Sequence, residues 1–302
     1  MNNIIFSEST TILKKIYKEM FLGFRENIIN IFLCGQSESV SNSIRELIYK
    51  KLKNDPKYEI IFPEWLFCNL LVDRKLNKNL LTLEGELAQD VDVIIIPIEG
   101  CGTMAELGAF SANKKLTPKI IVLNDQKYKT CKSFITIGPV KLVKEKNKHN
   151  VIYYNPDEMD ELTSSVLSRI KALGKISNPL DLGNIFGLSR FVLYVIALYQ
   201  KINKKEIVEL LKNFKPNIRV DYLDPCIDFQ IYNNKYVKME KDDHTEYFSL
   251  TNDGHNYVYE LVLNKFSKKK IFSSTRAHII NNRYNIKKKY NFDEEQKRFL
   301  GV

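Results

Sequence analysis

Residues 91–111, VDVIIIPIEGCGTMAELGAFS, constrain the fold of this chain more than any other segment. The apolar run at 91–96 has the length and β-branched composition of a buried strand, and a turn of small residues follows it. The spacing after the turn predicts a helix over 103–112 that carries Glu106 in its first turn. A strand, a tight turn and a helix in this order are typical of open α/β folds, which bind ligands at the carboxyl ends of their strands. The segment therefore predicts an enzyme with a carboxylate nucleophile at that edge.

The first half of the chain repeats this alternation of strands and helices. Strands are predicted at 28–34, 58–62, 119–123 and 151–154, and helices at 43–53, 80–89 and 157–173. The spacing of Ser43 and Glu46 is that of a capping box at a helix start. The alternation predicts an α/β fold, a doubly wound parallel sheet with right-handed crossovers. Residues 9–24 add an amphipathic helix, which either packs on this domain or forms a subunit contact.

The second half has a different pattern, which predicts a smaller C-terminal winged helix-turn-helix domain. Helical spacing at 189–201, 204–213 and 219–232 is followed by alternating segments at 236–241 and 247–250, and then by a helix to 266. Ser177-Asn178-Pro179 is typical of a domain boundary. We expect four regions: 1–160 (α/β domain with the N-terminal helix), 161–185 (linker helix and boundary), 186–267 (winged helix-turn-helix domain) and 268–302 (basic tail).

The positive charge of the chain is concentrated in its second half. The formal net charge is +10; residues 1–162 hold 22 Lys and Arg against 21 Asp and Glu, a difference of +1, and residues 163–302 hold 24 against 15, a difference of +9. A basic half-chain is typical of nucleic-acid binding, although a general Ile/Lys/Asn bias of composition gives the same count. The candidate phosphate contacts, each of which could also be a solvated side chain, are Lys201, Lys204, Lys205, Arg219, Lys235 and Lys238.

Composition argues against several classes of protein. Five cysteines without a CxxC pair and four histidines without ligand spacing argue against disulfides and against a zinc or other metal site. No segment has the roughly 18 consecutive apolar residues of a membrane helix, and the first ten residues lack the pattern of a signal peptide. We therefore expect a cytoplasmic protein with no membrane partner, and the apolar stripe of 9–24 favours a homo-oligomer.

Residues that directly follow the predicted strands should line one crevice of the sheet. They provide acids, an aromatic ring, and glycines whose backbone N–H groups a ligand can approach. The candidates are Cys34, Gly35, Gln36, Glu64, Trp65, Glu99, Gly102 and Thr103. The chain lacks both the GxGxxG dinucleotide fingerprint and the GxxxxGK[ST] phosphate loop, which argues against hydride and phosphoryl transfer.

The acids and the aromatic residue of this crevice each have two interpretations. Thr103 and Glu106 have capping-box spacing, so the Glu106 carboxylate could simply accept a hydrogen bond from a backbone N–H. The same position near a helix N-terminus favours an ionised carboxylate, which can attack the anomeric carbon of a sugar. Glu99 binds a sugar hydroxyl or is a solvated turn acid. Trp65 stacks on a base or covers the core, and Glu64 binds a ribose or starts a helix.

Residues 31–144 resemble the nucleoside 2-deoxyribosyltransferase-like effectors that are encoded beside reverse transcriptases in retrons. Five blocks match in the same order and with similar spacing: IFLCG (31–35), FPEWLF (62–67), LLTLEGELAQDVDVII (80–95), TMAELGAFSAN (103–113) and KSFITIGPVKLV (132–143). The helix-turn-helix pattern at 185–266 agrees with the second domain of those effectors.

The resemblance implies roles for individual residues. It implies that Glu106 is the nucleophile and that Asn113, in the fourth block, joins the crevice residues in binding substrate. Deoxyribosyltransferases carry an aspartate six residues before the nucleophile; here that position is Gly100, and the neighbouring Glu99 is the second catalytic candidate. This departure favours an N-glycosidase over transfer between deoxynucleosides.

The function implied is that of a retron antiphage defence effector, a toxin that hydrolyses NAD⁺ to nicotinamide and ADP-ribose and needs no further cofactor. The implied partners are the retron reverse transcriptase and its msDNA, an RNA–DNA hybrid, which would control the activity through the basic second domain. Two other functions fit the same sequence: a nucleotide-sensing winged-helix transcriptional regulator, and a nucleoside deoxyribosyltransferase of salvage metabolism.

Overall fold

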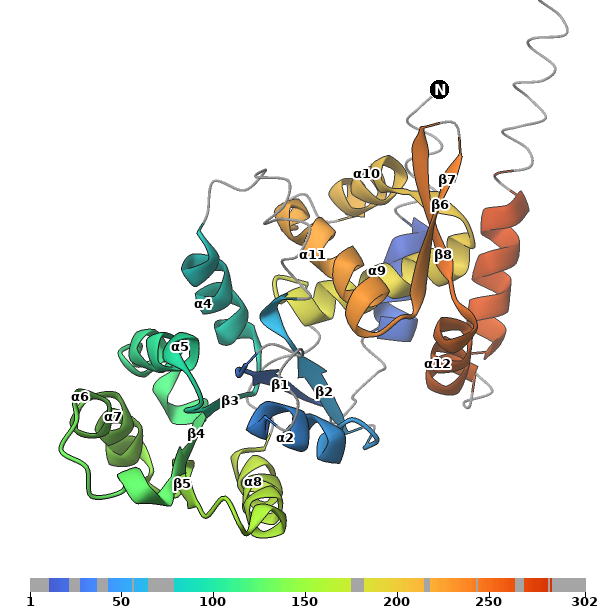
Figure 1. The fold of residues 1–302 in the computed structure, drawn as a ribbon. Helices are drawn as coiled ribbons and strands as arrows, with labels where there is room; N and C mark the ends of the chain where they lie inside the picture. The colour runs from blue at the N-terminus through green and yellow to red at the C-terminus, as the bar shows by residue number, and fades with distance from the viewer. Residues whose placement is uncertain are drawn as a thin grey trace, which may run out of the picture. The chain divides into compact units, whose positions relative to one another are not determined.

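The computed structural model of the chain describes residues 11–21, 28–36, 43–55, 57–64, 79–174, 182–214, 218–242, 244–263, 269–281 and 283. The chain divides into two compact units, whose helices and strands are drawn in Figure 1. Glu26–Pro179 forms an α/β unit, and Met1–Arg25 together with Leu180–Val302 forms a second unit, here called the C-terminal unit. The expected boundary at Ser177–Pro179 lies outside the described residues.

Five parallel strands form the centre of the α/β unit. They are β1 (Ile29–Leu33), β2 (Tyr58–Ile61), β3 (Val93–Pro97), β4 (Ile120–Asp125) and β5 (Val151–Tyr154). Their order is β2-β1-β3-β4-β5, and every neighbouring pair is parallel, which confirms the predicted parallel α/β sheet. The winding reverses between β1 and β3, and sheets of this order bind ligands beside the carboxyl ends of the strands at that point.

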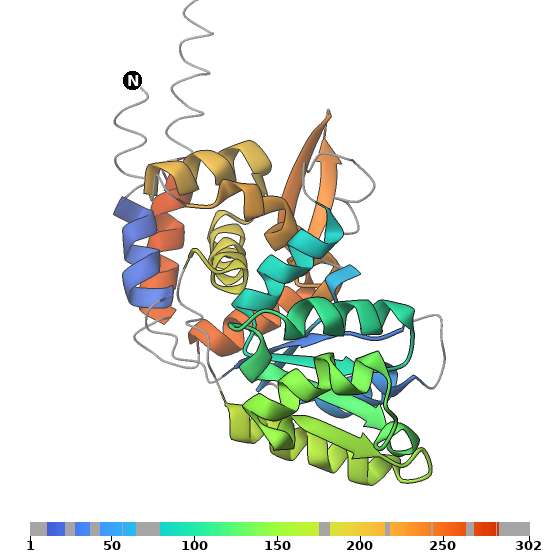
Figure 2. The same ribbon diagram turned by 90° about the vertical axis from the view of Figure 1, so that its left-hand side faces the viewer.

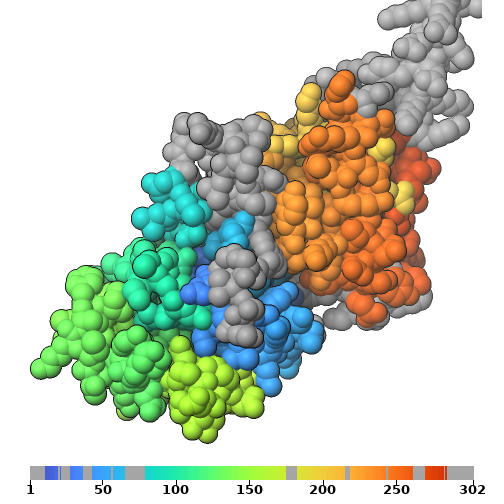
Figure 3. Space-filling model, viewed as in Figure 1, coloured from blue at the N-terminus to red at the C-terminus, as the bar shows by residue number. Residues whose placement is uncertain are grey.

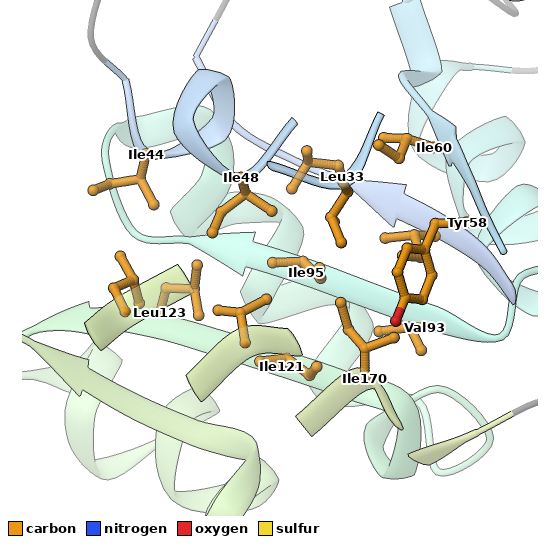
Figure 4. Packing of buried hydrophobic residues seen from close by; sticks show 14 of the residues in the cluster. Leu33, Ile44, Ile48, Tyr58, Ile60, Val93, Ile95, Ile121, Leu123 and Ile170 are labelled. Carbon is orange, nitrogen blue, oxygen red and sulfur yellow. The ribbon is translucent and has the colours of Figure 1, made fainter. Parts of the chain in front are cut away.

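One face of the sheet packs on α2 (Ile44–Leu52) and α8 (Met159–Leu173). Leu33 and Ile95, from β1 and β3, belong to one buried cluster with Ile48 and Ile170 from the two helices (Figure 4). Ser43 caps α2, because its hydroxyl accepts a hydrogen bond from the Glu46 backbone N–H at 3.1 Å, and this predicted cap is confirmed. The cluster removes the apolar side chains of alternate strand positions from water.

The other face of the sheet is covered by α4 (Leu80–Asp90), α5 (Cys101–Ser111) and α7 (Pro139–Lys146), of which α5 and α7 are seen lying along the strands in Figure 2. Phe32 on β1 and Phe110 on α5 meet there with their ring centroids 5.8 Å apart. Helices on both faces match the near-continuous apolar sequence of strands such as β3, which is buried along its whole length.

The C-terminal unit is organised around α9 (Ile185–Tyr199), which is buried from Phe191 to Leu198. Asn184 caps this helix by accepting hydrogen bonds from the N–H groups of Phe186 at 2.9 Å and Gly187 at 3.3 Å. A helix with apolar residues on all its sides is typical of the centre of a domain.

Several short helices and strands follow α9 along the chain. They are β6 (Ile202–Asn203), α10 (Lys204–Phe214), α11 (Leu223–Asp228), β7 (Val237–Asp242), β8 (Thr245–Leu250) and α12 (Asn252–Leu263). The strands form an antiparallel sheet of order β6-β8-β7, so the predicted hairpin is confirmed. The hairpin is among the orange atoms at the surface of this unit in Figure 3, and β7 is exposed from Lys238 onward. The predicted helix at 219–232 is instead divided into a 3₁₀ turn, α11 and a π-helical turn.

Both ends of the described chain differ from the sequence prediction. Residues 11–21 belong to the C-terminal unit and not to the α/β domain, because the rings of Tyr17 and Phe21 lie 6.0 and 5.5 Å from that of Phe191 on α9. Residues 269–281, expected to be part of a basic tail, form a helix that buries Phe272 and Ile279. Apolar periodicity identifies such a stripe but not the surface on which it packs. None of the helices within the described ranges has the length and apolar composition needed to cross a membrane.

Candidate active site

Helix α5 begins two residues earlier than the sequence predicts, and this changes the role of Glu106. Gly100 is the N-cap, and the Thr103 hydroxyl accepts hydrogen bonds from the N–H groups of Gly100 at 3.2 Å and Glu99 at 3.3 Å. The same hydroxyl donates to the Gly100 carbonyl oxygen at 2.9 Å. The capping box between Thr103 and Glu106 is therefore wrong: Thr103 closes the helix start, and Glu106 stands in the second turn with no capping function.

The Glu106 carboxylate points to the end of β1. Burial raises its pKa, while a hydrogen bond from the Cys34 side chain lowers it; the negative charge of Glu64 raises the pKa and the positive charge of Arg45 lowers it. Oxygen Oε2 of Glu106 is buried and has no hydrogen-bond partner among the described residues. A buried carboxylate oxygen that the protein leaves unpaired is typical of a functional site.

Glu84, on α4, is a second acid of this cluster and is not among the residues predicted from the sequence. Burial raises its pKa to about 7, and the negative charges of Glu106 and Glu64 act in the same direction. Glu84 is only 8% exposed. A signal for it was present, because Glu84 lies three and four residues before the buried Leu87 and Ala88 and therefore on the apolar stripe of α4. An acid on an apolar stripe is a candidate functional residue.

Arg45, in the first turn of α2, is the cation of the cluster and was also missed. Its Nη1 forms an ion pair with Glu64 Oε1 at 2.6 Å and donates to the carbonyl oxygens of Gly35 at 3.3 Å and Gln36 at 3.1 Å. Its guanidinium lies 4.1 Å from the centroid of the Phe62 ring. Gly35 has a φ of 151°, and a Cβ there would lie 2.5 Å from the Cβ of Arg45, so only glycine fits this turn.

Glu99 occupies a different place from the one expected of a catalytic acid. Its Oε1 accepts a hydrogen bond from the Ile44 N–H at 2.6 Å, and its backbone oxygen accepts one from Gln36 Nε2 at 3.0 Å. These bonds join the end of β3 to the first turn of α2 and to the turn after β1. Oε2 of Glu99 is buried without a hydrogen-bond partner in the part of the chain that is described.

The structure brings together some of the predicted substrate-binding residues and separates others. Cys34 and Glu64 are near enough to Glu106 to shift its pKa, and Gly35 and Gln36 accept hydrogen bonds from Arg45. Gly102 is exposed in the first turn of α5, whereas Thr103 is buried beneath it.

One predicted residue falls elsewhere. Asn113 follows the C-terminus of α5, about 10 Å along the helix direction from Glu106, where its side chain accepts a hydrogen bond from the Lys115 N–H at 3.0 Å. The structure thus places it in a turn away from the acids. Trp65 lies outside the described residues.

The arrangement gives this edge of the sheet the groups needed for acid–base and nucleophilic chemistry. Glu64 and Glu106 both interact with the buried guanidinium of Arg45, and Glu84 is close enough to both acids for their charges to raise its pKa, so the three carboxylates cannot all be ionised at low cost. Neighbouring carboxylates with separated pKa values are the usual basis for assigning one acid and one nucleophile. Glu84 is the group positioned to carry a proton near pH 7, and Glu106 has Arg45 and Cys34 to favour its charge.

The basic residues proposed for nucleic-acid contacts are spread over the C-terminal unit, and four of the six form ion pairs. The pairs are Lys201–Asp242 at 3.2 Å, Lys204–Asp224 at 2.5 Å, Arg219–Asp221 at 2.9 Å and Lys238–Glu240 at 2.7 Å. All of these pairs are at the surface, where such interactions are weak and exchange with other ions. Lys205 and Lys235 are exposed and have no ion-pair partner within the described segments.

Comparisons with known proteins identify the family. The family model described as STM3845 retron effector protein matches residues 41–234. The chain is 30% identical over 282 residues to the retron Ec86 putative ribosyltransferase/DNA-binding protein of Escherichia coli, covering 88% of this chain and 89% of that protein. It is 31% identical over 154 residues to the retron Ec73 putative ribosyltransferase/DNA-binding protein of Escherichia coli, covering 50% of this chain and 48% of that protein. The chain therefore belongs to the STM3845 retron effector family.

Proposed function

We propose that this retron effector cleaves the N-glycosidic bond of a nucleotide, and that its substrate is NAD⁺, which it hydrolyses to nicotinamide and ADP-ribose. The observation that carries the proposal is the placement of Glu106. Its carboxylate takes no part in capping α5, because Gly100 and Thr103 form the start of that helix. It is buried near two further acids at the carboxyl edge of the sheet, and one of its oxygens has no hydrogen-bond partner among the described residues. The relatives named putative ribosyltransferase support a reaction at a ribose carbon.

In the proposed reaction the Glu106 carboxylate attacks the anomeric carbon of the ribose while the bond to the base breaks. The transition state resembles an oxocarbenium ion, as in retaining glycosidases. The electron pair of the broken C–N bond returns to the nicotinamide ring, which was cationic and leaves as a neutral molecule. The leaving group therefore needs no proton.

Water then completes the proposed reaction. It attacks the same carbon and releases Glu106, while its proton passes to Glu84, whose pKa of about 7 suits it to accept a proton at neutral pH. With a neutral nucleoside the same group, in its protonated form, would protonate the leaving base. Glu64, which is half-exposed beside Arg45, is proposed to hold a ribose hydroxyl.

Glu99 and Gly100 bear on the choice between hydrolysis and transfer. Because Gly100 offers no carboxylate and Glu99 is hydrogen-bonded to Ile44 N–H, we assign Glu99 a structural role at the start of α2. Without a side chain to bind a second nucleobase at this position, water is the proposed acceptor.

We propose further that the C-terminal unit is a winged helix-turn-helix domain that binds the retron's nucleic acid. The order of α9, β6, α10, α11 and the hairpin β7–β8 is that of such a domain. Membership of a retron effector family supports association with the reverse transcriptase and msDNA, and the relatives are named DNA-binding proteins. Lys205 and Lys235 can contact phosphates directly, whereas the four ion-paired cations would exchange a carboxylate for a phosphate.

A panel of nucleotides tests the catalytic proposal. Purified protein, with and without its reverse transcriptase and msDNA, is incubated with NAD⁺, NADP⁺, deoxynucleosides and nucleoside monophosphates, and the products are identified by mass spectrometry. Nicotinamide and ADP-ribose should appear with the wild type and be absent with Glu106→Gln. Glu145→Gln, which changes an exposed acid on α7, is the matched control. Unchanged product formation by Glu106→Gln would remove the assignment.

A nucleotide-sensing regulator is the second candidate, because the relatives are named for DNA binding as well as for ribosyl transfer. In that case the wild type binds a nucleotide of the panel, releases no base from any of them, and changes its affinity for duplex DNA when the nucleotide is present.

A further inference from the structure

The side chains of β1 alternate between the two faces of the sheet, and this places Cys34. Ile31 and Leu33 belong to the buried cluster that contains α2 and α8. Phe32 points to the opposite face, where its ring meets that of Phe110. Cys34, two residues after Phe32, therefore points to the same face as Phe32, one step closer to the carboxyl edge.

The residues of α5 match this alternation. The helix starts at the carboxyl edge, after β3, and runs back along the sheet, so Glu106 lies nearer that edge than Phe110 does. Glu106 and Phe110 are four residues apart and share one side of the helix. The alternation thus places Cys34 opposite Glu106, one step along from the contact of Phe32 with Phe110.

The surroundings of Cys34 make its thiol a hydrogen-bond donor and not a nucleophile. The residue is 1% exposed, and its backbone N–H donates to the Ile95 carbonyl oxygen at 3.0 Å. Burial raises the pKa of the thiol well above its usual value, and the charge of Glu106 raises it further. The thiol therefore keeps its proton, and Glu106 is the acceptor that faces it.

We infer that Cys34 is a positioning residue, whose S–H donates a hydrogen bond to the Glu106 carboxylate and holds it charged and aimed at the substrate. The inference rests on the function proposed above. Two charged groups also act on the pKa of Glu106: Arg45 from α2 favours its charge, and Glu64 after β2 opposes it. Glu84 on α4 belongs to the same cluster, because the charge of Glu106 raises its pKa. Loss of the thiol would leave Arg45 alone to favour the charge, among the described residues.

Replacement of Cys34 by residues with and without a donor tests this role. In Cys34→Ala and Cys34→Val the limb of the pH–rate profile that reports the ionisation of Glu106 should move up by about one pH unit, and at pH values below that limb the rate should be about tenfold lower than in the wild type. Cys34→Ser, which keeps a donor, should retain the wild-type profile. Cys226→Ala, which removes an equally buried thiol in the C-terminal unit, should also retain it. A purely packing role would make Ser and Ala equally impaired with no shift of the limb, and this result would overturn the inference.

A measurement that needs no turnover separates this inference from the proposed function. The titration of the Glu106 carboxyl carbon is followed by ¹³C NMR in protein labelled at glutamate, and the signal is assigned by its absence in Glu106→Gln. Its midpoint should rise by about one pH unit in Cys34→Ala and Cys34→Val but not in Cys34→Ser. Identical midpoints in all variants would refute the role of Cys34, whereas failure of the wild type to cleave any nucleotide would refute only the proposed reaction.

Discussion

The two edges of the parallel sheet both bury charged groups, but they complete the hydrogen bonds of those groups differently. At the amino edge, Lys119 Nζ donates to the carbonyl oxygens of Gln89 at 2.9 Å and Val91 at 2.7 Å, and Asp92 Oδ2 accepts from the Asn30 N–H at 2.9 Å. At the carboxyl edge, one oxygen of Glu106 is buried without a partner among the described residues. Burial of a charge is therefore not by itself the mark of the site; Glu106 differs from Lys119 and Asp92 because its burial is combined with an incomplete set of partners and with neighbouring acids.

Glu106→Gln should give the largest effect and act on catalysis alone. Turnover of the substrate should fall by at least about 10³-fold, because the amide cannot attack the anomeric carbon. The free energy of unfolding at pH 7 should stay the same or increase, since a neutral group suits this burial better than a carboxylate does. Chemical denaturation together with a rate assay measures both. A large loss of stability in this variant would mean that the two edges do not differ as described.

Lys119→Met should do the reverse and act on stability alone. Two buried carbonyl oxygens lose their donor, so the free energy of unfolding should fall by about 3 kcal/mol. The Michaelis parameters of the folded fraction should remain those of the wild type, because Lys119 lies at the far edge from the acids. Urea denaturation measures the free energy of unfolding, and a rate assay below the melting temperature measures the Michaelis parameters of the native protein. If the fully folded variant lost turnover, the amino edge would also contribute to catalysis, and the difference between the two edges would be contradicted.

Glu84→Gln should have a smaller catalytic effect and a distinct pH signature. The rate should fall by about 10²-fold, as expected for loss of a general acid or base. The folded-state pKa of about 7 lies above the ordinary value of 4.5, so between these pH values the folded protein binds more protons than the unfolded chain. The free energy of unfolding should therefore fall as the pH rises from 4.5 to 7, by roughly 2–3 kcal/mol for this group.

This pH dependence should disappear in Glu84→Gln, and urea titrations at pH 4.5, 5.5 and 7 would detect the difference. Glu86→Gln, on the same helix and less buried, is the control and should follow the wild type. Equal slopes in all three proteins would show that Glu84 titrates normally.

Ser43→Ala should have the smallest effect of the series. It removes the cap of α2, the helix that carries Arg45, and should lower the free energy of unfolding by about 1 kcal/mol. Ser43→Asp, which retains an acceptor at the cap, should restore the stability. The melting temperatures of the two variants measure the effect, and equal values would show that the cap contributes nothing.

The strands of the α/β unit were predictable because each is an apolar run bounded by small or polar residues, and β3 is the clearest example. The cap at Ser43 was predictable because its side chain is the signal. The start of α5 was not, because the N-cap Gly100 has no side chain to mark it, and a threonine three residues later can serve either as an N-cap or as the residue that closes the start.

Contacts between residues far apart in the chain could not be predicted from local patterns. The acid cluster joins α2, α4 and α5. Arg45 resembles an ordinary polar residue of an amphipathic helix until its burial is known, and although Glu84 lies on the apolar stripe of α4, that stripe does not tell which residues face it. The helical character of residues 11–21 was predictable. The residue on which this helix packs, Phe191, is some 170 residues away along the chain, and the apolar periodicity of a helix does not identify such a distant partner.

The packing of residues 11–21 with the C-terminal unit has a consequence for how the chain is made. The α/β unit, Glu26–Pro179, is one uninterrupted stretch placed inside the sequence of the other unit. During synthesis it leaves the ribosome complete, and can fold, while the C-terminal unit still lacks most of its residues and the first helix has nothing to pack on. The acids of the sheet edge are thus assembled before the unit that carries the basic surface exists, and any restraint on them at that stage must come from another molecule or from the α/β unit itself.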